Sequence, residues 1–165
     1  MLTARTLLRA GHWTGPAADT VSLDYDGRFL RRKRLRTDAG EDLLLDLAET
    51  VSLNQGDALQ SETGDNVEVI AAAEPLLKVT GDLTRLAWHI GNRHTPCQLA
   101  ADHLIIRDDH VLADMLRYLD AKTEKIVQPF TPEGGAYGHG RTHSHDLGAD
   151  RDHPHGHSHK HSHGD

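Results

Sequence analysis

The fold is decided by residues 76–91, which read LLKVTGDLTRLAWHIG. The first five residues predict a short strand, and Pro75 lies at its start, where proline is tolerated. Asp82 is a suitable N-cap. Apolar residues then recur at the i, i+3, i+4 and i+7 positions of an amphipathic helix, namely Leu83, Leu86, Ala87 and Ile90. Gly91 is a residue type that ends helices, so we expect a strand and then a helix ending there.

A second helix is predicted further along the chain from the same kinds of pattern, an N-cap residue and an apolar face. Two strands are predicted between residues 98 and 107, and either acidic residue of the pair 108–109 can cap the helix that follows. Its apolar face comprises Val111, Leu112, Met115, Leu116 and Leu119. Residues 124–128 predict a last strand. The order is β-α-β-β-α-β, which is the ferredoxin-like split βαβ arrangement, over about residues 75–130.

The first half of the chain has a different period. Residues 21–25 alternate apolar and polar side chains, and Asp26-Gly27 predicts a turn. Short strands at similar spacing predict a small β-sandwich or a barrel-like module. The expected class is α+β, with three parts: an all-β domain (1–73), a ferredoxin-like domain (74–138) and a disordered His-rich tail (139–165).

The tail stands apart in composition. The whole chain is 37% apolar and has 14 histidines, but residues 139–165 contain two apolar residues, Leu147 and Ala149. So little apolar surface cannot offset the entropy of ordering the segment. Nine of the histidines lie there: His139, His143, His145, His153, His155, His157, His159, His161 and His163.

These nine histidines predict a metal-binding tail. Imidazole binds Ni²⁺, Zn²⁺ and Cu²⁺, and eight of the nine belong to His-x-His pairs, which place alternate side chains on one side of an extended chain. Binding requires neutral imidazole, so it weakens as pH falls through the ordinary histidine pKa near 6.5. A cloning tag and a pH-responsive polyelectrolyte are the alternatives, and the Ser, Gly, Lys and Pro interruptions argue against a tag.

Composition also excludes several classes of protein. No window approaches 18 consecutive apolar residues, the N-terminus lacks a signal-peptide pattern, and one cysteine cannot form an internal disulfide. We therefore expect no membrane span and a cytoplasmic protein. The net charge of −7 disfavours general nucleic-acid binding, although residues 31–36 contain five basic residues. This run could contact nucleic acid or an acidic partner, and a solvated strand face is the simpler interpretation.

No catalytic motif is evident, and Cys97 is expected to be a buried thiol rather than a nucleophile. Three body histidines, His12, His89 and His103, are expected to be surface or satisfied residues. His94 follows the first predicted helix, on a loop that could present it to a dimer axis. His110 lies beside the acidic pair 108–109. These three residues could form a weak metal site or could simply cap the second helix.

Several segments together resemble the UreE family of urease accessory proteins, which are nickel metallochaperones. In the second half these are Gly91–His94, Asp109–Leu116, Pro129–Gly138 and the histidine-rich end. In the first half they are Arg34–Arg36, Gly56-Asp57 and Val67–Glu74. The resemblance covers most of residues 1–138 in the family's order.

The resemblance implies an N-terminal domain that binds partner proteins and a second domain that forms a homodimer. It places His94 at the family's metal-binding histidine, near the two-fold axis. His110 matches one histidine of a second, peripheral site, but Asp108 replaces the other. The implied cargo is Ni²⁺, with Zn²⁺ and Cu²⁺ as alternatives. The implied partners are the GTP-dependent urease accessory complex and, through it, apo-urease.

The resemblance also implies a protein that is not an enzyme, because nickel delivery breaks no covalent bond. In this mechanism the tail histidines complete a site between the two copies of His94 and exchange ions with it. The rival hypothesis is a general buffer or store for nickel, zinc or copper that acts through the tail alone.

Overall fold

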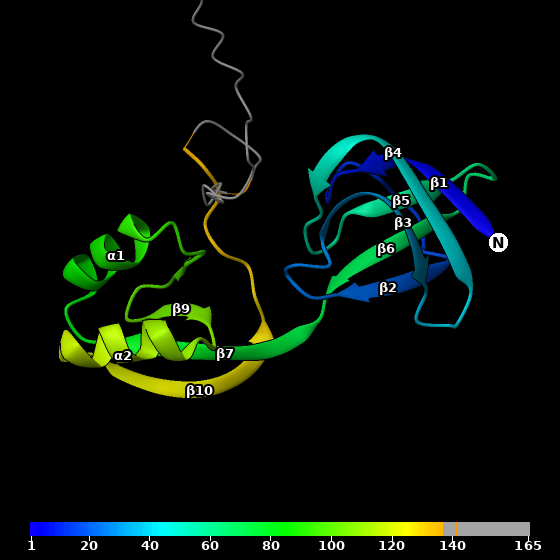
Figure 1. The fold of residues 1–165 in the computed structure, drawn as a ribbon. Helices are drawn as coiled ribbons and strands as arrows, with labels where there is room; N and C mark the ends of the chain where they lie inside the picture. The colour runs from blue at the N-terminus through cyan, green and yellow to red at the C-terminus, as the bar shows by residue number, and fades with distance from the viewer. Residues whose placement is uncertain (137–140, 142–165) are drawn as a thin grey trace, which may run out of the picture.

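The computed structural model describes residues 1–136 and 141, and these form two sheets that lie beside each other (Figure 1). The first sheet contains the strands β1 (Leu2–Leu8), β2 (Asp19–Leu23), β3 (Phe29–Arg36), β4 (Asp42–Ser52), β5 (Ala58–Ser61) and β6 (Asn66–Ala71). Their order is β2-β6-β5-β1-β4-β3. The pairs β1–β4 and β2–β6 are parallel, and the other pairs are antiparallel.

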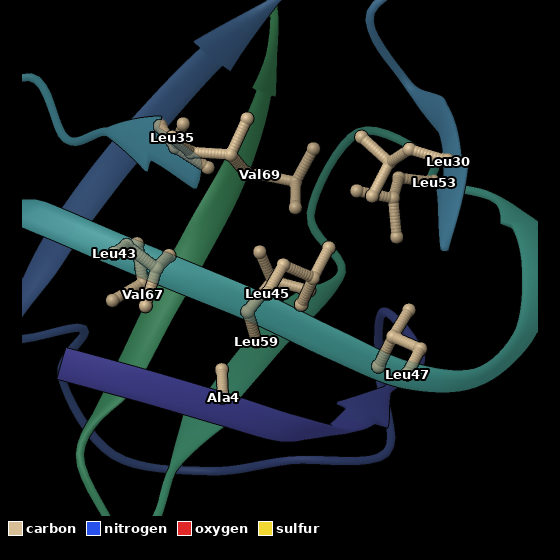
Figure 2. Packing of buried hydrophobic residues seen from close by; sticks show 11 residues of the cluster. Ala4, Leu30, Leu35, Leu43, Leu45, Leu47, Leu53, Leu59, Val67 and Val69 are labelled. Carbon is tan, nitrogen blue, oxygen red and sulfur yellow. The ribbon is translucent and has the colours of Figure 1, made fainter. Parts of the chain in front are cut away.

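This sheet curls around a single core, as the barrel-like prediction expected. Val21 comes from the edge strand β2, and Leu30 and Leu35 come from the opposite edge strand β3, yet all three belong to one buried cluster. Figure 2 shows side chains of β1, β3, β4, β5 and β6 meeting in this interior. In a flat sheet the two edge strands would lie too far apart to share a core. Their common core therefore shows that the sheet is curved.

Asp38 helps to close the curled sheet. Its carboxylate accepts hydrogen bonds from the hydroxyls of Thr20 (2.5 Å) and Ser22 (2.9 Å), and its backbone N–H donates to the Thr20 carbonyl (2.8 Å). The turn between β3 and β4 is thereby tied to β2. These hydrogen bonds, that from Thr20 foremost, lower the pKa of the Asp38 carboxyl below its ordinary value.

Asp38→Asn is expected to change how stability depends on acid. Because the folded pKa is depressed, the carboxylate stabilises the fold above its ordinary pKa of 3.8, and this contribution is lost as pH falls through the folded value. The variant should therefore unfold at lower urea concentration than the parent at pH 7, and this difference should shrink as pH falls below 3.8. Asp114→Asn, which changes an exposed carboxylate in the second half of the chain, is the control. A constant difference between parent and variant from pH 7 to pH 3 would contradict this role.

The strands of the second sheet are interrupted by two helices along the chain. Its elements are β7 (Ala73–Thr80), α1 (Leu83–Asn92), β8 (Gln98–Leu99), β9 (Leu104–Arg107), α2 (His110–Tyr118) and β10 (Lys122–Pro129). The strand order is β10-β7-β9-β8, and all neighbours are antiparallel. The β-α-β-β-α-β order predicted from the sequence is confirmed.

The helix termini lie where the sequence predicts them, with one exception. Asp82 caps α1 by accepting from the Arg85 N–H (3.3 Å), and of the two acidic candidates it is Asp109 that caps α2. The prediction that α1 ends at Gly91 was wrong, because the helix continues through Asn92. The chain reverses three residues later than expected, at His94, which has a positive φ of 55°.

Both helices cover one face of the second sheet. Leu86 and Ile90 of α1 and Leu112 and Leu116 of α2 pack with the buried residues of β7 and β9. A separate cluster joins the two halves of the chain and comprises Tyr25, Leu76, Ile105 and Phe130. Within the described residues, neither helix is long and apolar enough to cross a membrane.

Candidate metal centre

His94 lies on the loop that follows α1. Its backbone N–H donates to the Gly91 carbonyl (2.9 Å), and its positive φ is uncommon for a residue other than glycine. This conformation turns the chain away from the helix axis, and the residue is exposed to solvent. It lines an open hollow of about 480 Å³ together with Arg93, Thr95, Pro96, Arg107, Asp108, Asp109 and Leu112.

The two carboxylates in this hollow already have partners. Asp109 Oδ1 accepts from the backbone N–H groups of Val111 (2.8 Å) and Leu112 (3.1 Å). Asp108 Oδ2 lies 3.7 Å from the Lys125 ammonium. The capping interpretation of this acidic pair is therefore confirmed for Asp109.

His110 is the first residue of α2 and is exposed, but it does not line the hollow with His94. Residues 1–136 and 141 contain no group of three or more His, Cys, Asp or Glu side chains placed to hold a metal ion. Imidazole sites for borderline metals need several ligands. A complete set of such ligands around His94 is therefore not present within the described residues.

The nine tail histidines, His139 to His163, lie outside the described residues, so their role stays a prediction. The three body histidines expected to be surface or satisfied residues are so. His12 is exposed, His89 makes an edge-to-face contact with Trp88 (5.0 Å between ring centroids), and His103 Nδ1 lies 2.6 Å from Asp102 Oδ1.

Cys97 is half-buried beside the core under the helices. Burial raises the pKa of its thiol to about 11. The reactive thiolate form is therefore scarce at neutral pH, which supports a packing role rather than a nucleophilic one.

The basic run 31–36 lies on β3, the edge strand of the first sheet, and all five of its basic residues are exposed. Arg34 pairs with Asp42 (2.6 Å) and Arg32 lies 3.7 Å from Asp46, both on the neighbouring strand β4. The five basic residues are therefore exposed, as expected for a strand face that contacts solvent.

Arg141 forms an anchor that the sequence did not predict. Its guanidinium carbon lies 3.6 Å from the Tyr25 ring centroid and 4.9 Å from that of Phe29, and its side chain is only 11% exposed. Nε donates to Ser52 Oγ (3.2 Å), and Nη2 donates to the Tyr25 carbonyl. Arg141 lies in a glycine-rich and polar stretch that has no helical or strand periodicity. Its contacts with Tyr25, Phe29 and Ser52 are therefore visible only in the folded structure.

Tyr25 connects this anchor to the hollow at His94. Arg107, which lines the hollow, lies 5.3 Å from the Tyr25 ring centroid and pairs with Asp26 at 2.8 Å. Asp26 also lies 4.0 Å from Arg141 Nη1. Arg141, two positions before His143 in the sequence, and Arg107 of the hollow thus both contact the Tyr25 ring.

Family profiles match nearly the whole chain. The profile of the UreE urease accessory protein N-terminal domain matches residues 2–72, and that of its C-terminal domain matches residues 67–163. The chain belongs to the UreE urease accessory protein family. The resemblance inferred from the sequence is confirmed, and the family indicates a role in urease maturation as an accessory protein rather than a catalyst.

Individual UreE proteins are similar over most of their length. The urease accessory protein UreE of Cereibacter sphaeroides is 61% identical over 145 residues, which cover 88% of this chain and 80% of the relative. The UreE of Ruegeria pomeroyi is 61% identical over 142 residues, or 86% and 95%. That of Rhodobacter capsulatus is 57% identical over 145 residues, or 88% and 92%.

Arg141→Ala is expected to release the anchor of this UreE protein. Loss of the contacts with Tyr25 and Phe29 should lower the free energy of unfolding by about 1 kcal/mol, the scale of a partly desolvated cation–π contact. Urea unfolding followed by circular dichroism measures this. Arg117→Ala is the matched control, because Arg117 is exposed and pairs only with Asp114 among the described contacts. Equal stability of the two variants would contradict the anchor.

Proposed function

We propose that this UreE family protein captures Ni²⁺ and delivers it to the urease assembly machinery. The observation that supports this best is the exposed imidazole of His94, held on a positive-φ turn at an open hollow. A cargo ion must be released, so an open and incomplete site suits delivery better than a closed cage of protein ligands.

The tight ion is proposed to lie between His94 of two copies in a homodimer. A two-fold axis brings the same residue of each copy to one point, so one exposed histidine supplies two ligands. Apolar side chains exposed on this half of the chain offer surface for a second copy: Trp88 on α1, Leu99 on β8 and Val111 on α2. An intersubunit site can open through small movements of the subunits and so release its ion.

The tail histidines are proposed to complete this site and to feed it. Ligands attached by a short linker act at a high effective concentration, which speeds capture and exchange. The Arg141 anchor supports this role, since it holds the chain two residues before His143 near Tyr25 and Arg107. A separate site at His110 and Asp108 is supported less, because Asp108 lies beside Lys125.

The other parts of the proposal follow the family. Residues 1–73 bind partner proteins, residues 74–138 dimerise and hold the metal, and residues 139–165 gather ions in the cytoplasm. The receiver is the GTP-dependent urease accessory complex and, through it, apo-urease. Zn²⁺ and Cu²⁺ compete for the same imidazoles, because copper binds nitrogen ligands more tightly than nickel.

A general metal buffer is the second candidate, favoured by the nine tail histidines. The two functions differ in whether the bound nickel is transferred to urease. The ⁶³Ni-loaded protein is mixed with apo-urease and the accessory complex in the presence of a chelator that removes free nickel. A chaperone transfers label and activates urease, and the His94→Ala variant does so far less than the parent. If His94→Ala and the control His12→Ala both transfer as well as the parent, delivery through His94 is wrong.

A further inference from the structure

The edge strand β3 carries a regular row of arginines. Arg32, Arg34 and Arg36 are spaced two residues apart and lie opposite Asp46, Leu44 and Asp42 of β4. Alternate residues of a strand share one face, so the three arginines form a row with steps of about 7 Å. Arg31 and Lys33 add two more exposed cations to the same strand.

This strand has an open side. It lies at the end of the sheet order and pairs with β4, and the backbone contacts within residues 1–136 and 141 give it no second strand partner. The outward N–H and C=O groups of an edge strand can accept another strand. The row of arginines therefore borders a side where an extended chain can add.

The positive charge of β3 is only partly balanced. Asp42 pairs with Arg34 at 2.6 Å, while Asp46 is shared by Arg32 (3.7 Å) and Arg5 of β1 (3.6 Å). Two carboxylates thus pair with a strand that carries five exposed cations, in a protein whose net charge is −7. Charge on an edge also hinders edge-to-edge aggregation, but that role needs no two-residue spacing.

We propose that β3 binds an acidic, extended segment of a partner protein, which adds to the sheet as a further strand. Carboxylates at every second residue of that segment match the row formed by Arg32, Arg34 and Arg36. Guanidinium groups bind carboxylates in a bidentate geometry, and the backbone groups of the edge supply the remaining hydrogen bonds. The proposal rests on the partner-binding role proposed for residues 1–73 and does not depend on nickel binding at His94.

The test uses the full chain and a fluorescein-labelled eight-residue peptide, the length of β3, with Glu alternating with Val. A second peptide has the same composition with its Glu residues clustered. Fluorescence anisotropy should show tighter binding of the alternating peptide. The triple variant R32Q/R34Q/R36Q should weaken that binding by about tenfold, from three pairs of modest strength each. The matched control R85Q/R93Q/R117Q should not.

Two further measurements make the result decisive. Amide hydrogen exchange should show new protection on β3 when the alternating peptide is bound, and an unchanged midpoint of urea unfolding shows that the triple variant is folded. Equal binding of the two peptides, or no new protection on β3, overturns strand addition. Tighter binding of a labelled oligouridylate, lost in the same triple variant, would assign the row of arginines to nucleic acid and overturn the proposal.

Discussion

His94→Ala is expected to abolish the tight binding of one Ni²⁺ per dimer. The substitution removes two ligands from each ion, because the proposed site contains His94 of both copies. Loss of groups that merely orient a ligand costs 10–100-fold in affinity, so loss of both ligands should exceed about 100-fold. Isothermal titration calorimetry of the full chain measures this as the loss of the tightest phase.

The weaker phase from the tail should remain in this variant, and the dimer should persist in light scattering. His12→Ala is the matched control, since His12 is another exposed body histidine on the first half. If His94→Ala and His12→Ala give the same titration curve, His94 is not a ligand. If the dimer dissociates in His94→Ala without metal, the residue acts in assembly instead.

Asp57→Ala is expected to lower the free energy of unfolding by about 3 kcal/mol. The Asp57 side chain is 1% exposed and holds three donors: Arg9 Nη1 (2.8 Å), the Ala10 N–H (3.0 Å) and the Asn54 N–H (2.8 Å). Removing the carboxylate leaves a partly buried guanidinium and two backbone donors without this acceptor. Urea unfolding of the parent and the variant measures the loss.

Two related variants separate the contacts of Asp57. Asp57→Asn keeps an acceptor of similar shape and should lose less stability than Asp57→Ala. Asp46→Ala removes a more exposed carboxylate from ion pairs of 3.6 and 3.7 Å and should cost at most about 1 kcal/mol. A loss below 1 kcal/mol for Asp57→Ala would show that the buried network contributes little to stability.

The second half of the fold could be predicted because its helices carry a clear apolar period. Leu86 and Ile90 mark the buried face of α1, and the caps Asp82 and Asp109 mark where the helices begin. The first half was harder. The sequence pattern does not reveal β1 or β5, since β5 has four residues and β1 buries only Ala4 fully.

The candidate site was predicted unevenly. His94 was found mainly through the family resemblance, because a single exposed histidine has no distinctive pattern of its own. The anchor formed by Arg141 could not be found, since its partner Tyr25 lies 116 residues away in sequence. Contacts of such separation depend on how the two halves of the chain meet at the cluster that contains Tyr25 and Phe130.

One nickel titration at neutral pH tests the central claim most directly. It compares the full chain, residues 1–138, and residues 1–138 with His94→Ala, with light scattering to give the mass. We predict one tight Ni²⁺ per dimer for residues 1–138, bound by the two copies of His94 but less tightly than in the full chain because the tail ligands are absent. We further predict loss of that ion with His94→Ala, and additional weaker ions in the full chain. Absence of any tight site in residues 1–138 would contradict the claim and assign nickel binding to the tail alone.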